Sequence, residues 1–296
     1  MNRKLKIDYN ALMDLRIDFA FKSLFAKGDP ASLISLLHAI FENKKIQRVI
    51  KTLKIKNPYL EKETSNDKLS ILDIRAELED GTNILIEMHM HGLGELKPKT
   101  IRSWARAYGE DLEMGEKFKS QPPTITIAFI DGQVKTLNSA NTDIHKIHRL
   151  CMITDVEDGA VFTDAMELHY IDMRAFAKAV NETGSITVND TEEILFSKWL
   201  SVIAQKEIVN KEIIASAVQE EEAIYMAVTA LARQSEDKLI RQAYQRRKDE
   251  IYFYNKEQAS YKQQLAEKDM LLSERDAENA ELRLQLEQLQ AQIARK

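Results

Sequence analysis

Two short alternating runs on either side of Asp80 and Gly81 constrain the fold of this chain more than any other feature. The apolar residues of both runs occupy every second position: Leu72, Ile74, Ala76 and Leu78, then Ile84, Ile86, Met88 and Met90. Successive side chains of a β-strand point to opposite faces, so each run predicts a strand with one apolar face. An Asp-Gly pair between two such runs is a strong signal for an antiparallel β-hairpin.

The opposite faces of the two predicted strands carry acidic and polar residues. Asp73 belongs to the first strand, and Glu87 and His89 belong to the second. If the loop has three residues with Gly81 in the left-handed conformation, Asp73 falls opposite Glu87, whereas a two-residue loop shifts the pairing by one. Two carboxylates and an imidazole in this arrangement can hold a divalent metal against a phosphate. Solvent-facing strand residues are the commoner explanation of such a pattern.

The composition narrows the class of protein. The chain has 296 residues, of which 44% are hydrophobic and 30% charged, as in a soluble globular protein with an exposed helical part. The single Cys151 excludes a disulfide framework and indicates a reducing compartment. No run approaches the ~18 apolar residues of a membrane span, so we expect a cytoplasmic protein without a membrane partner. The net charge of −5 argues against nonspecific coating of nucleic acid, although a local basic patch could still bind the phosphate backbone of a nucleic acid.

The predicted elements of the first 130 residues follow the order α-β-β-β-α-β. We expect a helical region over 8–43 that breaks at 27–30, strands at 46–56, 69–79, 83–91 and 124–130, and a helix over 99–119. Further strands are predicted at 148–154 and 166–173, and helices at 192–205 and 218–232. A sheet with flanking helices is the fold class that this order favours.

The last part of the chain, from about residue 236, contains neither proline nor glycine and ends in a heptad pattern. The a positions are Leu265, Leu272, Asn279, Leu286 and Ile293, and the d positions are Tyr261, Lys268, Arg275, Leu282 and Leu289. This pattern predicts a coiled coil that makes the chain a homo-oligomer, and Asn at an a position favours a parallel dimer. The alternative is a single solvated helix.

Several motifs together carry a resemblance to a known family. The main ones are RIDFAFKSLF at 16–25, SILDI at 70–74 and NILIEMH at 83–89, and the others lie at 102–108, 115–118, 123–127, 166–170 and 198–200. In order and spacing they resemble the recombination-promoting nuclease family of bacteria, also described as transposases. That family belongs to the PD-(D/E)XK nuclease superfamily. The resemblance covers most of the chain up to about residue 255.

The resemblance implies an α/β fold with a restriction-endonuclease-like core, in which helices flank a mixed sheet. We therefore expect a PD-(D/E)XK nuclease-like domain over 1–180, a helical region over 181–254 and a coiled-coil tail over 255–296. The implied activity is that of a DNA endonuclease that depends on Mg²⁺, with Mn²⁺ as an alternative, and is linked to recombination or mobile elements. The partners implied are DNA and further copies of the chain.

The resemblance also implies the site. The metal-binding carboxylates of the family match Asp73 and Glu87, and Asp18 would supply a third acidic group. Asp18 could instead pair with Lys22 one helical turn later. His89 stands where the family usually has glutamine and where the superfamily name implies lysine. It can position the attacking water as a hydrogen-bond donor, or it can mark lost or altered activity.

A basic helix face follows the Glu87 strand. Lys99, Arg102 and Arg106 share one face of the predicted helix, where they can hold phosphates near the metal or simply be solvated. The sequence is therefore compatible with two functions. The first is a metal-dependent DNA endonuclease. The second is a catalytically inactive nuclease-fold protein that serves as an oligomeric DNA-binding or protein-interaction module.

Overall fold

The computed structural model describes residues 7–56, 59–60, 70–71, 73–90, 95–110, 121–131, 146–188 and 193–293. The chain divides into two units, Met1–Gln245 and Arg246–Lys296. Among the described residues, no helix combines the length and the apolar character that crossing a membrane requires.

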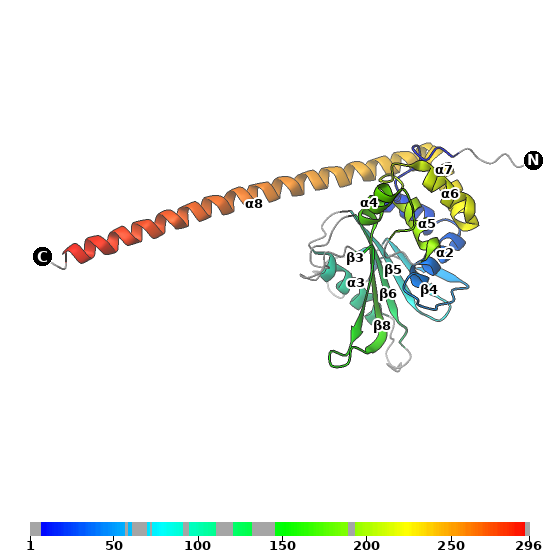
Figure 1. The fold of residues 1–296 in the computed structure, drawn as a ribbon, viewed down its shortest axis with the longest axis horizontal. Helices are drawn as coiled ribbons and strands as arrows, with labels where there is room; N and C mark the ends of the chain where they lie inside the picture. Colours follow the sequence, from blue (N-terminus) through cyan, green and yellow to red (C-terminus); the bar gives the residue numbers. More distant parts are fainter. Residues whose placement is uncertain are drawn as a thin grey trace, which may run out of the picture. The chain divides into compact units, whose positions relative to one another are not determined.

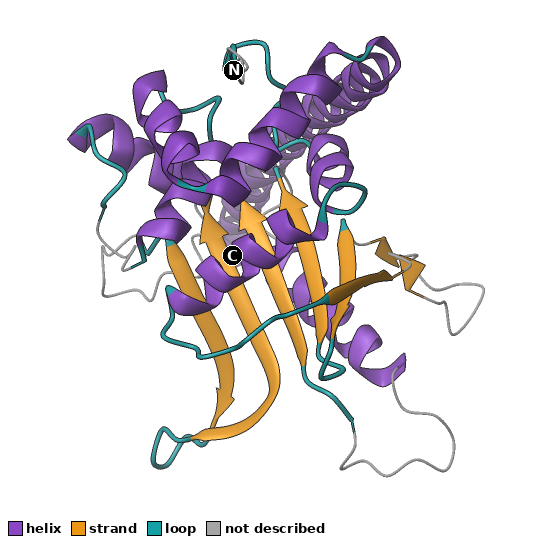
Figure 2. Cartoon of the chain, turned by 90° about the vertical axis from the view of Figure 1, so that its right-hand side faces the viewer, coloured by secondary structure: helices purple, strands orange, loops and turns teal. Residues whose placement is uncertain are grey.

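A six-stranded mixed β-sheet forms the centre of the first unit (Figure 2). In spatial order its strands are β1 (Leu53–Lys56), β4 (Ile74–Leu78), β5 (Asn83–His89), β6 (Thr124–Ile130), β8 (Val161–Asp172) and β7 (His148–Thr154). β5, β6 and β8 run parallel to one another, and the other neighbours are antiparallel. Two short strands, β2 (Tyr59–Leu60) and β3 (Ser70–Ile71), pair separately. The mixed sheet confirms the predicted fold class.

The hairpin of β4 and β5 has the register that a three-residue loop predicts. Ile74 pairs with Ile86, and the Leu78 N–H donates a hydrogen bond to the Thr82 carbonyl at 2.9 Å. Gly81 has a φ of 85°, which is the left-handed conformation that glycine adopts at little cost. The ladder starts at Ile74 and Ile86, so Asp73, which was predicted to lie opposite Glu87, stands one residue outside it.

Helices lie on both faces of the sheet (Figure 2). On one face, α3 (Leu96–Glu110) packs through Leu96 and Trp104 against Ala128 and Tyr170 of the parallel strands. On the other face, α1 (Asp18–Phe25) and α2 (Pro30–Glu42) pack through aromatic rings. The Phe21 and Phe129 ring centroids lie 5.6 Å apart, and those of Phe41 and His169 lie 5.7 Å apart. The site residues of β5 are therefore enclosed between two helical layers.

Four shorter helices complete the first unit, and one long helix follows (Figure 1). They are α4 (Met173–Thr183), α5 (Ile194–Ile203), α6 (Lys211–Glu220) and α7 (Glu222–Glu236), followed by α8 (Lys238–Ile293). α8 has 56 residues, and its part beyond Gln245 makes up the described portion of the second unit.

Several predicted boundaries were wrong. The helix expected from residue 8 begins only at Asp18, because the backbone before it has tertiary partners instead of helical ones. The Met13 N–H donates to Ser235 Oγ at 2.9 Å, and the Asp14 N–H donates to Tyr244 Oη at 3.1 Å. The first strand begins at Leu53 instead of residue 46. The predicted helix at 218–232 is divided between α6 and α7, and α4 was not predicted.

A buried polar chain crosses the sheet face that carries α2. His148 Nδ1 lies 2.9 Å from Asn43 Nδ2, and His148 Nε2 lies 3.0 Å from His169 Nδ1. Glu167 Oε2 lies 3.5 Å from His169 Nε2, and Arg48 contacts Glu167 Oε1 at 2.9 Å. Burial lowers the pKa of His148 well below its usual value, and the neighbouring charges of His169 and Lys44 lower it further.

We expect this buried imidazole to make the fold less stable in mild acid. The unfolded chain protonates His148 near pH ~6.5, whereas the folded chain keeps it neutral, so the unfolded state binds more protons below that pH. The free energy of unfolding should fall by about 1.4 kcal/mol from this one group between pH 7.5 and 5.5. Urea denaturation across that range measures the change. His148→Gln should flatten the dependence, and an unchanged slope in that variant would contradict the assignment.

Candidate functional site

Asp73 lies between α1 and the backbone of β5. Its Oδ1 is 3.1 Å from Lys22 Nζ, and its Oδ2 accepts a hydrogen bond from the Met88 N–H at 2.5 Å. Met88 is the residue between Glu87 and His89, so this bond fixes the Asp73 carboxylate beside the acidic part of β5. The side chain of Asp73 is 12% exposed.

Asp18 acts on Asp73 from the first turn of α1. Burial raises the pKa of Asp73, while Lys22 and the Met88 N–H oppose the rise. The negative charge of Asp18 adds to the rise of the Asp73 pKa. A cation near Asp73 would offset that repulsion. Lys22 contacts Asp73, and the pairing of Asp18 with Lys22 stays a prediction.

Glu87 lies on the opposite side of the sheet, under α3. Its Oε2 is 3.1 Å from His89 Nε2 and 3.4 Å from Lys99 Nζ, and only 3% of its side chain is exposed. Burial works against the ionisation of Glu87, but His89, Lys99 and Ser103 outweigh it and lower the pKa. Glu87 is therefore an ionised carboxylate in a nearly closed space, where charge interactions are strong.

Both carboxylate oxygens of Glu87 lack a directed hydrogen bond. They are buried, and among the described residues none donates to them with strict hydrogen-bond geometry, although His89 and Lys99 lie within ion-pair distance and the Ser103 side chain helps to lower the pKa. A buried carboxylate without well-directed hydrogen bonds can accept a further ligand. Carboxylate oxygens are the hard ligands that Mg²⁺ and Mn²⁺ accept. The carboxylates of Glu87 and Asp73 are thus of the chemical type that a divalent metal accepts.

The acidic side chains nevertheless form two adjoining groups instead of one cluster. Lys22 contacts Asp73, on which the charge of Asp18 also acts, whereas Glu87 and His89 lie under α3. Within the described ranges, no group of three or more His, Cys, Asp or Glu side chains is placed to hold a metal ion. A bound ion would have to draw the two groups together across the Met88 backbone.

The basic residues of α3 take different positions. Lys99 is 58% exposed while its ammonium contacts Glu87, and Arg102 is also exposed. Arg106 is half-buried and has a partner of its own. Ser103, which helps to lower the pKa of Glu87, was not predicted, although its place one turn after Lys99 on the same helix face could have revealed it.

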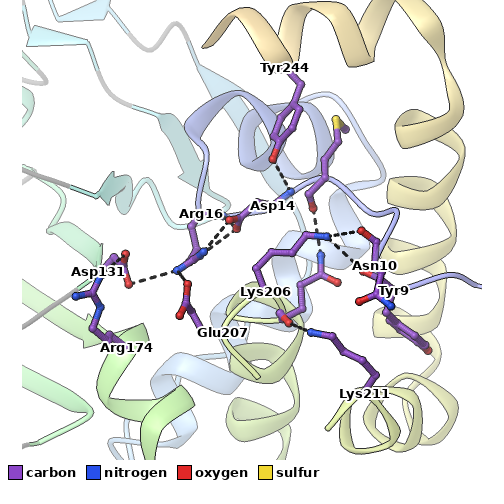
Figure 3. Close-up of polar contacts among 12 residues, drawn as sticks. Tyr9, Asn10, Asp14, Arg16, Asp131, Arg174, Lys206, Glu207, Lys211 and Tyr244 are labelled. Carbon is purple, nitrogen blue, oxygen red and sulfur yellow. Dashed lines mark hydrogen bonds and ion pairs between the residues drawn. The ribbon is translucent and has the colours of Figure 1, made fainter. Parts of the chain in front are cut away.

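Arg16 joins the segment before α1 to the end of β6 (Figure 3). Its guanidinium contacts Asp14 at 2.8 Å, Asp131 at 3.5 Å and Glu207 at 2.6 Å, and Arg174 contacts Asp131 at 3.2 Å. Burial disfavours the charge of Arg16, but these acidic neighbours outweigh it and raise the pKa. The Asp131 N–H donates to the His89 carbonyl at 3.0 Å. The network, to which sequence reasoning assigned no role, therefore connects the start of α1 with the end of β5.

Comparison with known proteins gives one result that covers most of the chain. Residues 15–259 match the model of the family described as PD-(D/E)XK nuclease family transposase. No match was found among curated proteins or among solved structures. The matched range begins just before Arg16 and includes β4, β5 and α3, with Asp18, Asp73, Glu87 and His89. This chain therefore belongs to the PD-(D/E)XK nuclease family transposases.

Proposed function

We propose that this protein is a metal-dependent DNA endonuclease that hydrolyses phosphodiester bonds in recombination or in the movement of mobile elements. Membership of a nuclease and transposase family supports the general role. The observation that carries the finer proposal is Glu87, a buried and ionised carboxylate whose oxygens lack directed hydrogen bonds, one residue from the amide that holds Asp73.

Each residue of the site has a proposed role. Asp73 and Glu87 would hold Mg²⁺ or Mn²⁺, and Asp18 would assist them with its negative charge. A bound divalent ion would supply a more acidic water and would stabilise charge on the leaving oxygen. His89, whose Nε2 faces Glu87, would hold the attacking water through a ring nitrogen.

The basic face of α3 is the proposed contact for the DNA backbone. Lys99 and Arg102 are exposed and lie one turn apart, with Arg106 one further turn along the helix. Because Lys99 touches Glu87, this face lies next to the carboxylate that would hold the metal. Contacts of this kind position a nucleic acid without reading its sequence.

Removal of the metal tests this proposal. The purified full chain should convert supercoiled plasmid to nicked or linear DNA in Mg²⁺ or Mn²⁺. Because the carboxylates alone cannot activate water or neutralise the leaving group, EDTA should abolish cleavage, and added metal should restore it. Gel analysis of the plasmid forms measures the rate. Cleavage that persists in EDTA, or no cleavage with either metal, would contradict the proposal.

We also propose that α8 makes the protein a parallel homodimer. The predicted a and d positions include exposed apolar side chains, with Leu265 60%, Leu272 61% and Leu286 57% exposed. A second copy is the occupant that the heptad pattern favours, because a parallel pairing also sets Glu257 opposite Lys262 and Glu278 opposite Arg283. Asn279 at an a position supports the same orientation.

Two adjacent leucines provide a matched test of the dimer. Leu271 and Leu272 are 60% and 61% exposed, but only Leu272 occupies an a position. Leu272→Asp should place a charge in the dimer core and weaken association by roughly 30-fold or more, whereas Leu271→Asp should have little effect. Light scattering after size-exclusion chromatography should give about twice 34.0 kDa for the native chain. Equal effects of the two substitutions would contradict the heptad register.

One observation favours a second candidate function. No set of three metal-ligating side chains is assembled among the described residues, and His89 stands where the resemblance implies lysine or glutamine. A protein of this kind could bind DNA or another protein as an oligomer without cutting. Retardation of DNA without cleavage in any metal, unaltered by Asp73→Ala and Glu87→Ala, would support this candidate over the nuclease.

A further inference from the structure

Helix α1 brings a cation to the acidic group around Asp73. Lys22 Nζ lies 3.1 Å from Asp73 Oδ1, and 30% of the Lys22 side chain is exposed. Asp18 begins the same helix one turn earlier, and its charge acts on Asp73. The ammonium group is therefore held beside Asp73, and the lysine side chain is only partly buried. A substrate anion can reach a cation in that position.

Strand β5 does not supply a comparable charge. The His89 side chain is 6% exposed, and its Nε2 faces Glu87 Oε2 at 3.1 Å inside the protein. Lys99 contacts Glu87 from α3, but its side chain is 58% exposed and belongs to the proposed DNA-binding face. Lys22 is more deeply enclosed than Lys99, and it faces the other carboxylate. A cation fixed in advance stabilises developing negative charge better than one that must reorganise.

We infer that Lys22 is a catalytic residue that supplies positive charge to the phosphate being cleaved. The inference rests on the proposed nuclease function. Lys22 forms and breaks no bond in this role, because it acts only through its charge. The charge comes from α1, which packs on the other face of the sheet from α3.

The electrostatics of this arrangement predict two opposite effects. Lys22 repels a divalent ion at Asp73, so its positive charge weakens metal binding. The same charge attracts the phosphate and stabilises the transition state. A lysine that merely held Asp73 in place would instead support both metal binding and cleavage. The signs of the two effects therefore separate a catalytic role from a structural one.

The experiment compares Lys22→Met with Lys27→Met, an exposed lysine that follows the same helix. Mn²⁺ binding is followed by electron paramagnetic resonance, and plasmid cleavage is measured at saturating Mn²⁺. Lys22→Met should bind Mn²⁺ about fivefold more tightly, because the repulsion is removed. It should cleave about 100-fold more slowly. Lys27→Met should match the native protein in both, and Lys22→Arg should recover at least part of the lost rate.

Each possible result either supports or overturns the catalytic role of Lys22. Cleavage by Lys22→Met within about threefold of the native rate would overturn it, since removing a fixed catalytic charge costs far more. Loss of Mn²⁺ binding together with cleavage would also overturn it, because Lys22 would then only hold Asp73. Lys22→Gln repeats the comparison if the methionine variant fails to fold. Absence of cleavage by the native protein overturns the nuclease proposal itself, whereas an active native protein with an equally active Lys22→Met overturns only the role of Lys22.

Discussion

Glu87→Gln is expected to slow metal-dependent plasmid cleavage by about 10³-fold while changing the free energy of unfolding by less than about 1 kcal/mol. Glutamine has the shape of glutamate, so the packing under α3 is kept. It lacks the negative charge that the proposed role of Glu87 as a metal ligand requires. Lys99 would lose its carboxylate partner, but its side chain is 58% exposed and water can solvate it.

Glu167→Gln is the matched control for this substitution. Glu87 and Glu167 are both 3% exposed glutamates on the same sheet, but Glu167 lies on the opposite face. Its carboxylate contacts Arg48 at 2.9 Å and His169 at 3.5 Å. Glu167→Gln should therefore keep cleavage but lower the stability by about 2 kcal/mol, because it leaves Arg48 with an unpaired, largely buried charge. Plasmid cleavage and urea denaturation of both variants make the comparison.

Equal effects of Glu87→Gln and Glu167→Gln on cleavage and stability would contradict the site assignment. Equal losses of cleavage would mean that a buried charge anywhere in the sheet matters, so Glu87 would have no special role. Full cleavage by Glu87→Gln would remove it from the metal site and leave Asp73 and Asp18 as candidates. Loss of cleavage with preserved stability in Glu87→Gln alone is the result that supports a metal ligand.

The hairpin was predictable because its determinants are local. The alternation of β4 and β5 needs only the neighbouring residues, and Gly81 fixes the loop through its own φ of 85°. The segment before Asp18 was not predictable, because its partners Ser235 and Tyr244 lie more than 200 residues away in sequence. The apolar pattern before Asp18 favours a helix, but tertiary hydrogen bonds hold this segment in a different conformation.

The site shows the same division between local and distant causes. Strand alternation identified Glu87 and His89 as neighbours on one face, and their side chains do lie 3.1 Å apart. Alternation could not show that Lys22 reaches Asp73 or that Lys99 reaches Glu87, since both contacts depend on how helices pack on the sheet. Whether Asp18, Asp73 and Glu87 share one ion stays a prediction for metal binding to test.

Arg16→Met is expected to lower the free energy of unfolding by about 3 kcal/mol. The Arg16 side chain is 8% exposed and contacts Asp14, Asp131 and Glu207. Methionine fills part of the space but leaves Asp14, which is 13% exposed, without this cation, and it leaves Asp131, which is 6% exposed, with Arg174 as its cationic partner. Breaking one partner of a buried charge network costs more than the network itself contributes, because the remaining charges stay desolvated.

Arg174→Met separates this effect from the simple loss of an ion pair. Arg174 contacts the same Asp131 at 3.2 Å, but its side chain is 63% exposed, so its removal should cost less than about 1 kcal/mol. Urea denaturation of the two variants measures the difference, and equal effects would contradict the role of burial.

The cleavage rates of the two variants, measured well below the denaturant concentration at which they unfold, test whether Arg16 also supports function. Arg16 holds the segment that leads into Asp18 and, through Asp131, the end of β5. A folded Arg16→Met protein should therefore cleave more slowly than Arg174→Met, because its acidic groups on α1 and β5 are less firmly aligned.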